Sequence, residues 1–489
     1  MMVDQKHSKK NILKNIFFIG GANIFSVIFG IIRMKFIAYM FGPSGIALLG
    51  LFQQFTISVS VTAALGIPLA STQSIGEANS NRETKELSLS VLVLFIWTIF
   101  SFLLGVLLLF AFSEFFVNLV FNNLIDLKIF YLLLASTGLA ILSNAVISFL
   151  QGLRLVKDYT KLTIFSGALG TFIGLITILY LDEDGIVFII LSLNFSLFLL
   201  GIGFLYKNRN YLFQIFSLNN ISRDFKKHLK KITFLGFAIG AYTILEQISF
   251  LWIRFYVESI YGLEELGIFQ SAFTISTMYL GLIFAALSKD FLPSIAEASS
   301  NLKLVNELIS KQVELALLLS VPLIILMIGY SPLILELLYT KEFSEAQNLL
   351  KILLFADIIK VVSFPIGFAI LGLGDSDAVK RQGPTQLMLL VALVYFFLPI
   401  LGIISYAYIY LFTSIVGLLW GHFYLFKKTG YLIKRESLIY SLIALLASFS
   451  IIFVGNIFGS NSVYLVSGFL FVIFAFYTLN KVRQFLYID

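Results

Sequence analysis

Long apolar runs are the feature that most constrains this chain. A helix needs about 20 mostly apolar residues to cross the hydrocarbon core of a bilayer. Fourteen such runs follow one another, at residues 16–39, 46–70, 88–112, 128–150, 161–181, 186–206, 232–256, 266–288, 312–330, 348–372, 384–401, 403–426, 437–457 and 462–480. The runs are continuous and do not alternate every second residue, which argues against a β-barrel. We therefore predict an all-α polytopic membrane protein with about 14 transmembrane helices.

Composition narrows the class further. The 489 residues are 59% hydrophobic and 12% charged, whereas a soluble chain is about 45–50% apolar and about 25% charged. The absence of cysteine excludes a disulfide scaffold and a zinc–thiolate site. The sequence has neither a phosphate-binding glycine loop nor a dinucleotide-binding glycine pattern. These observations exclude a soluble enzyme and an ATPase, and we expect no cofactor and no metal site.

The basic residues predict the orientation in the membrane. Most of the 34 lysine and arginine residues fall in alternate loops, on the side that also holds the N-terminus. Cytoplasmic loops carry the excess of basic residues. We therefore predict that both termini are cytoplasmic, and we assign the net charge of +7 to topology and anionic lipid, with no nucleic-acid partner. The most basic of these segments is 207–231.

An internal repeat relates the two halves of the chain at an offset of about 220 residues. The matched pairs are Gly50–Gln53 with Gly267–Gln270, Phe55–Ser58 with Phe273–Ser276, and Ser74–Asn81 with Ser294–Asn301. Six helices per copy is an even number, so the copies are parallel and related by an axis along the membrane normal. This predicts an N-terminal six-helix bundle (1–206), a basic linker (207–231), a second six-helix bundle (232–426) and two additional helices (427–489).

Charged side chains inside the apolar runs are the candidate functional residues. Each costs at least ~2.5–3.5 kcal/mol at the centre of a helix, so a membrane chain seldom keeps one without a use. The cations are Arg33, Lys35, Arg254 and Lys360, and the carboxylates are Asp357 and Glu246. Four cations against two carboxylates predict a cavity that binds an anion, with Arg and Lys suited to phosphate oxygens. Gln53 and Gln270 are polar candidates for the same cavity.

Each of these charges also has a structural interpretation. Arg33 and Lys35 can extend to the outer headgroups. Asp357 and Lys360 can neutralise each other on one helical face, and Glu246 can pair with Arg254.

The repeat separates the candidates into two kinds. It aligns Arg33 with Arg254, so this charge is present in both copies. It aligns Asp357 with Thr137 and Lys360 with Ala140, so these charges are present in the second copy alone. We therefore expect ligand orientation or ion coupling to lie on the second half.

Several short motifs resemble those of a known family. Phe41–Gly45, Arg254, Gly267–Gln270 and Asp357–Lys360 are similar to motifs of the O-antigen and lipid III flippases, polysaccharide transporters of the multidrug/oligosaccharidyl-lipid/polysaccharide exporter superfamily. The resemblance implies two six-helix bundles with alternating access in the bacterial inner membrane. It also implies a substrate, an undecaprenyl-diphosphate-linked glycan moved to the outer leaflet.

The leading hypothesis is thus a flippase for an O-antigen-type repeat unit in lipopolysaccharide biosynthesis, and not an enzyme. Arg33, Lys35, Arg254 and Lys360 would bind the diphosphate or acidic sugar. Asp357 or Glu246 would couple transport to a gradient of Na⁺ or H⁺. Other polysaccharide-assembly membrane proteins are candidate partners. Two alternatives stay open: a cation-coupled multidrug exporter of the same superfamily, and a membrane-embedded glycan polymerase or ligase.

Overall fold

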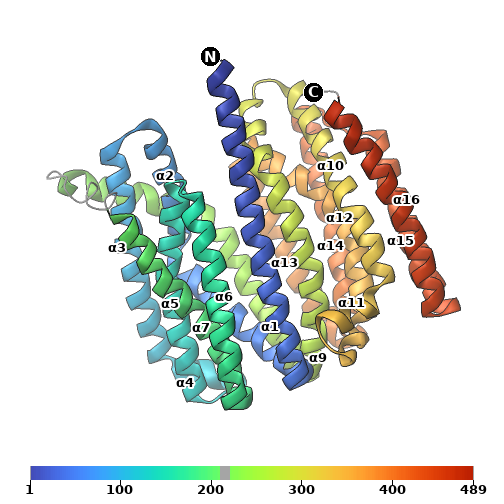
Figure 1. Cartoon of the computed structure of the whole chain (residues 1–489), viewed down its shortest axis with the longest axis horizontal. Coiled ribbons are helices and arrows are strands. Elements are labelled where there is room, and N and C mark those ends of the chain that lie inside the picture. The colour runs from blue at the N-terminus through green and yellow to red at the C-terminus, as the bar shows by residue number, and fades with distance from the viewer. Residues whose placement is uncertain (1, 210–220, 488–489) are drawn as a thin grey trace. The chain divides into compact units, whose positions relative to one another are not determined.

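The computed structural model describes residues 2–209 and 221–487, and these residues form helices joined by short turns (Figure 1). The chain divides into two compact units, Met1–Leu263 and Glu264–Asp489. The long helix α9 (Ile221–Glu297) runs from the first unit into the second. The division into bundles at the 207–231 linker stays a prediction, since residues 210–220 of that linker lie outside the described residues.

The first unit is built from helices that pack along their length. Besides the first part of α9 it contains α1 (Met2–Ala64), α2 (Ile67–Asn81), α3 (Thr84–Ala111), α4 (Ser113–Phe115), η1 (Phe116–Val120), α5 (Leu127–Gly152), α6 (Val156–Leu181), η2 (Asp182–Asp184) and α7 (Gly185–Lys207). Helix α5 contacts α2, α3 and α7, and α1 contacts α5 and α6. The core of this unit includes Ile75, Leu94 and Phe149.

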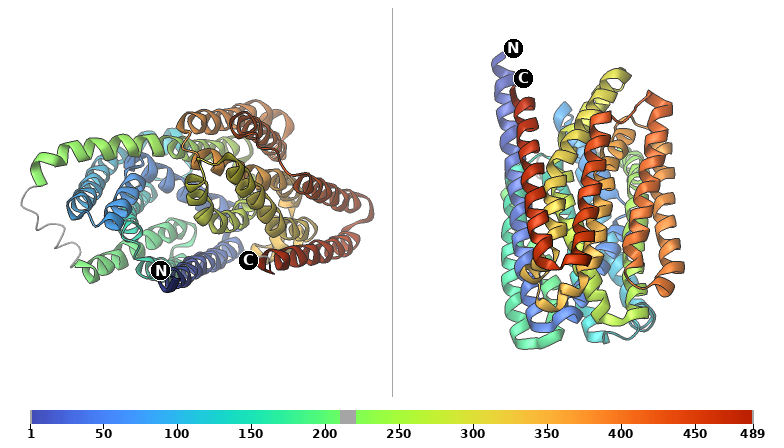
Figure 2. Two further views of the ribbon diagram at one scale, coloured as in Figure 1. Left: turned by 90° about the horizontal axis from the view of Figure 1, so that it is seen from above. Right: turned by 90° about the vertical axis from the view of Figure 1, so that its right-hand side faces the viewer.

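The second unit is also built from packed helices. After the end of α9 it contains α10 (Leu302–Gly329), α11 (Ser331–Leu338), η3 (Lys341–Ala346), α12 (Gln347–Gly372), α13 (Ser376–Leu401), α14 (Ser405–Thr429), α15 (Arg435–Phe458) and α16 (Ser460–Tyr487). Helix α12 contacts α10 and α14. Helices α15 and α16 both pack on α10, so the two additional helices belong to this unit (Figure 2).

The described residues contain candidate membrane-crossing segments, judged by the length and apolar composition of their helices. Eleven helical stretches are long and apolar enough to cross a membrane, and three of them contain an interruption near the middle. The interrupted stretches are Phe25–Ala64, broken at Gly42, Val156–Lys207, broken at Asp182–Asp184, and Gly240–Glu297, broken at Gly262. The sequence prediction of an all-α polytopic protein with about 14 such helices is therefore confirmed.

The internal repeat is visible in the backbone. Helices α5 and α12 both have 26 residues and begin 220 positions apart, and α6 and α13 repeat this match. The breaks at Gly42 (φ +59°) and Gly262 (φ +82°) keep the same spacing. A positive φ with extended ψ is accessible almost only to glycine. Both copies thus turn from their first to their second helix at an equivalent glycine.

The two copies also share a close contact. A Cβ at Gly152 would lie 2.7 Å from Cγ2 of Ile75, and a Cβ at Gly372 would lie 2.7 Å from Cγ2 of Ile295. Ile75 and Ile295 occupy the same position in the repeated Ser-Ile-x-Glu-Ala motif. The repeated sequence is therefore a packing motif. It lets the end of the fourth helix of each copy, α5 or α12, lie close to the helix that carries the motif.

One helix departs from the sequence prediction. The second apolar run was expected to be a single helix, but it ends at Ala64 and resumes at Ile67, with positive φ at Leu65 and Gly66. A Cβ on Gly66 would lie 2.2 Å from the carbonyl oxygen of Gly236 in α9. The break follows from this glycine-to-glycine contact, which hydropathy does not report.

The interruption leaves a carbonyl group in need of a partner, because a broken helix loses backbone hydrogen bonds. The indole N–H of Trp97 in α3 donates to the carbonyl of Ala64 over 3.1 Å. In a membrane-spanning segment, this bond replaces the hydrogen bond that water would otherwise donate to the carbonyl oxygen.

Candidate functional site

A buried polar cluster in the second unit surrounds Asp357 of α12. Its carboxylate is fully buried, at 0% exposure. Ser276 Oγ and the Tyr279 hydroxyl each donate to Oδ2 over 2.8 Å, and the Tyr410 hydroxyl donates to Oδ1 over 3.3 Å. A buried carboxylate is tolerated only when hydrogen bonds replace its hydration. Three donors from α9 and α14 meet this requirement.

Lys360 joins the cluster through Tyr410. Its Nζ donates to the Tyr410 hydroxyl over 2.7 Å and lies 5.0 Å from the centre of the tyrosine ring. A phenol has one proton to donate and lone pairs that accept. The Tyr410 hydroxyl therefore accepts from Lys360 while it donates to Asp357. The expectation that Asp357 and Lys360 share one face of a helix is met, with the tyrosine placed between them.

The described residues of the first unit have no charged cluster at the repeat-equivalent positions. At the repeat offset the positions of Asp357, Lys360 and Tyr410 are Thr137, Ala140 and Ile190. The Thr137 hydroxyl bonds to the Leu133 carbonyl in its own helix. The same helix packing is thus built without the charges, so the fold itself does not require them.

Arg33 and Lys35 lie on different sides of α1 in the first unit. Arg33 is partly buried, and its Nη1 donates to Oγ1 of Thr171 in α6 over 2.9 Å. The Lys35 side chain is exposed. Arg33 therefore points toward the interior of the first unit, and Lys35 lies on its surface.

Arg254 is buried in the first unit at 6% exposure, and its Nη1 donates to the Phe250 carbonyl over 3.0 Å. Measured from the breaks at Gly262 and Gly42, Arg254 and Arg33 are one residue out of register. One residue turns a helix by about 100°. The two arginines consequently face different neighbours in the structure.

The remaining candidates are distributed along α1 and α9. Glu246 accepts a hydrogen bond from the Tyr242 hydroxyl over 3.4 Å, and its pairing with Arg254 stays a prediction. Gln53 is exposed. Gln270 Nε2 donates to Oγ1 of Thr274 over 3.0 Å. Asp357 and Lys360 are two candidates that the structure brings together, through Tyr410.

A polar network beside Gln53 was missed by the sequence reasoning. The neighbouring Gln54 is buried, and its Nε2 donates to Oε1 of Gln247 over 2.9 Å. Ser58 Oγ donates to the Gln247 carbonyl over 2.9 Å. The motif Phe-Thr-Ile-Ser ends at Ser58 in one copy and at Ser276 in the other, and each of these serines donates a hydrogen bond to a group on another helix. The repeat was the signal that could have found them.

Ion pairs join the last helices of each copy at the ends next to the basic loops. Lys207 Nζ lies 2.5 Å from Oδ1 of Asp158 in the first unit. Lys428 Nζ lies 2.5 Å from Oδ2 of Asp375 in the second. The bonds that Asp375 accepts from Lys428, Tyr424 and the Ala378 amide hold the pKa of that carboxyl well below its usual range.

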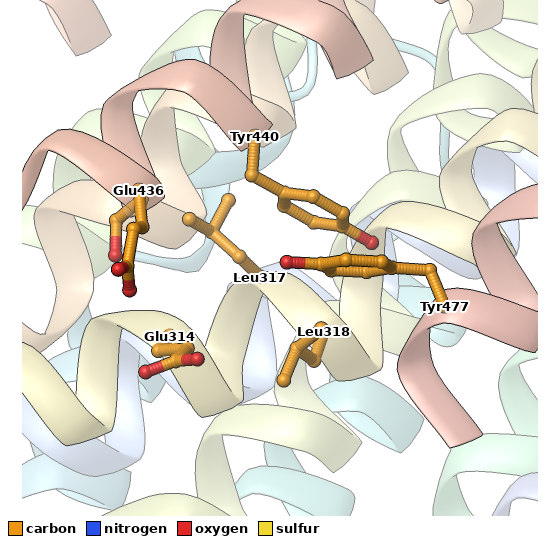
Figure 3. Close-up of a pocket in the computed structure, with 7 residues that line it drawn as sticks. Glu314, Leu317, Leu318, Glu436, Tyr440 and Tyr477 are labelled. Atoms are coloured by element: carbon orange, nitrogen blue, oxygen red, sulfur yellow. The ribbon is translucent and has the colours of Figure 1, made fainter. Parts of the chain in front are cut away.

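A separate pocket lies between α10, α15 and α16 of the second unit (Figure 3). Glu314 and Glu436 border it on one side, and the stacked rings of Tyr440 and Tyr477, with centroids 5.3 Å apart, border it on the other. The residues that line this pocket come from α10 and from the two additional helices, α15 and α16. Over the described residues, no three His, Asp or Glu side chains lie close enough to hold a metal ion.

Solved structures with this fold are membrane transporters. An inward-facing multidrug resistance MATE family transporter of the MOP superfamily superimposes with a TM-score of 0.67 at 15% identity, covering 83% of this chain and 96% of that one. The lipid II flippase MurJ in an inward closed conformation superimposes with a TM-score of 0.65 at 17% identity, covering 96% of this chain and 100% of that one. These likenesses show that the chain shares the fold of these two transporters.

The family follows from the sequence. Residues 12–299 match the model of the polysaccharide biosynthesis protein family, and the chain belongs to that family. A putative O-antigen transporter of Shigella flexneri is 26% identical over 185 residues, which are 37% of this chain. The matched region spans 43% of that protein's length. The resemblance inferred from the motifs is confirmed, and the chain is a multi-pass membrane protein.

Proposed function

We propose that the protein is a flippase that moves an undecaprenyl-diphosphate-linked oligosaccharide, an O-antigen-type repeat unit, from the cytoplasmic to the outer leaflet of the bacterial inner membrane. The observation that carries the proposal is the cluster of Lys360, Tyr410 and Asp357 on membrane-spanning helices. The cluster is present in one copy of the repeat, and the other copy packs its helices without an equivalent cluster.

The substrate class follows from the charge of this cluster. A lysine is costly in a membrane-spanning helix, and such a residue commonly marks a substrate path. An ammonium group is a point charge that suits phosphate oxygens. The diphosphate of a lipid carrier is such an anion, and its isoprenoid tail can remain in the bilayer. Arg33, Lys35 and Arg254 are the further cations of the proposed path, with Gln53 and Gln270 as polar contacts.

Transport requires alternating access and a source of energy. We assign coupling to an ion gradient, of Na⁺ or H⁺, because no nucleotide-binding motif is present in the sequence. The buried Asp357 is the first candidate for the coupling carboxylate, and Glu246 is the second. Both termini are cytoplasmic in this proposal, and other polysaccharide-assembly proteins of the membrane are its partners.

Complementation in a host that lacks the gene tests the function. Arg254→Ala and Lys360→Ala should each lower surface polysaccharide to below about a tenth of the wild-type level, since loss of an electrostatic contact to a phosphate costs on the order of 1.5–3 kcal/mol. Lipid-linked intermediates should accumulate on the cytoplasmic side. Lys303→Ala, at an exposed position of α10, is the matched control and should complement fully.

The amount of each variant in the membrane is measured by immunoblot, so that lost function is separated from lost protein. Full complementation by both Arg254→Ala and Lys360→Ala would exclude the anion path.

A multidrug exporter is the second candidate, favoured by the fold likeness to MATE family transporters. Drug resistance on expression, with normal surface polysaccharide after deletion, would support it. A glycan polymerase or ligase would need catalytic groups in long outer loops. The segments expected on the outer side instead fold as short helices, α4 with η1 and α11 with η3.

A further inference from the structure

We infer that Tyr410 is a positioning residue that couples anion binding at Lys360 to the charge on Asp357. The inference rests on the proposed function, because it takes the anion at Lys360 to be a diphosphate. It adds a role for Tyr410, and a linkage between two sites, that the proposed function does not contain.

The geometry places one hydroxyl group in two bonds. The Tyr410 oxygen lies 2.7 Å from Lys360 Nζ, as acceptor, and 3.3 Å from Asp357 Oδ1, as donor. A phenol that donates its proton to a carboxylate becomes a better acceptor on its other side, since bonded groups polarise one another. The anionic Asp357 therefore strengthens the bond that holds Lys360 toward Tyr410.

The consequence concerns the ligand. Tyr410 holds one of the three protons of the Lys360 ammonium, and an anion that draws the ammonium toward itself weakens that bond. When Asp357 is neutral, Tyr410 is no longer required to donate to it, and the hold on Lys360 weakens. Neutralising Asp357 should therefore raise anion affinity by two routes, the direct Coulomb effect and the path through Tyr410. The direct Coulomb effect does not need the Tyr410 hydroxyl.

The matched control is Tyr279, a second tyrosine on the same carboxylate. Its hydroxyl donates to Oδ2 of Asp357 over 2.8 Å, on the opposite oxygen from Tyr410. Tyr→Phe at either position removes one bond to Asp357 and keeps the ring. Tyr410 is the one whose hydroxyl also bonds to Lys360.

The experiment is a double-mutant cycle on the purified full chain, with inorganic diphosphate titrated by calorimetry. Asp357→Asn should raise diphosphate affinity about tenfold in the wild-type background, within the range typical of coupled sites. In the Tyr410→Phe background the same change should raise it about threefold or less. In the Tyr279→Phe background the full effect should remain. Tyr410→Met, which also lacks the hydroxyl, serves if Tyr410→Phe does not fold.

Two results would overturn the inference in distinguishable ways. An equal effect of Asp357→Asn with and without the Tyr410 hydroxyl would remove the coupling role and leave the anion site intact. Unchanged diphosphate affinity in Lys360→Ala would remove the anion site itself, and with it the proposed function.

Discussion

At the scale of single residues, a buried polar group depends on hydrogen-bonding and charged partners from other helices, and His228 is an example. His228, in the part of α9 before the membrane-spanning segment, is buried at 6% exposure. Its Nε2 lies 3.0 Å from Ser90 Oγ, and its Nδ1 lies 3.4 Å from a carboxylate oxygen of Glu86. Burial lowers the pKa of His228, nearby Glu86 opposes this, and nearby Lys231 adds to it.

The free energy of unfolding should therefore decrease as the pH decreases, over the pH range in which His228 takes up a proton. Its pKa in the unfolded chain is about 6.5. Below that pH the unfolded state binds a proton that the folded state takes up only at lower pH, so stability is present above about pH 6.5 and is lost as the pH decreases. The melting temperature of wild type should drop more between about pH 7.5 and 5.5 than that of His228→Gln. Parallel curves for the two proteins would contradict this role of His228.

At the scale of helices, the repeat is maintained by small residues where elements cross. Gly152 and Gly372 end α5 and α12, and each faces the isoleucine of its own copy. Gly66 meets Gly236 at the break between α1 and α2, a contact that exists in the first unit. Glycine at a close crossing allows backbones to approach, as is common in membrane helices.

Alanine at the two crossing glycines should destabilise both copies alike. Gly152→Ala and Gly372→Ala each place a methyl group 2.7 Å from an isoleucine, and overpacking of this kind costs about 1–3 kcal/mol. Gly367→Ala is the control in the same α12, because a Cβ there meets no atom within 4 Å. It should be neutral or slightly stabilising, since alanine favours helix over glycine.

The measurement is thermal unfolding of the purified variants in one detergent. Equal melting temperatures for Gly372→Ala and Gly367→Ala would show that the Ile295 contact imposes no constraint.

At the scale of the whole molecule, the two copies have the same helix plan but different chemistry. The helices of the second unit carry Asp357, Lys360 and Tyr410 where the first has Thr137 and aliphatic side chains. The second unit also carries α15 and α16. In the proposed function, the helix plan common to the two copies serves the movement, and the charged residues of the second unit serve recognition.

Topology can be measured directly, because the chain has no cysteine and is its own background for labelling. Cysteines at Asn123 and Asp184 should react with a membrane-impermeant maleimide in intact cells. Cysteines at the exposed Lys157 and Lys303 should react only after lysis. The positive-inside distribution requires this pattern. The opposite pattern would place both termini outside and reverse the proposed direction of transport.

The extent of sequence prediction differs between elements for physical reasons. The tenth apolar run was predicted at 348–372 and the helix spans Gln347–Gly372, because a bilayer-length apolar run has few alternatives to a helix. The break at Leu65–Gly66 was not predicted, since it depends on Gly236, far away in the chain. Asp357 and Lys360 were found because charges are costly in membranes. Tyr279 and Tyr410 were not found, since hydroxyl side chains are common there.

The sequence by itself determined the class, the number of crossings, the repeat and the charged residues, because each depends on local composition and on the cost of moving groups out of water. The tertiary structure decided which groups pair. It placed a tyrosine between Asp357 and Lys360, turned Arg33 and Arg254 toward different neighbours, and broke one helix at a glycine crossing. Pairing depends on helix rotation, and one residue of register turns a side chain by about 100°.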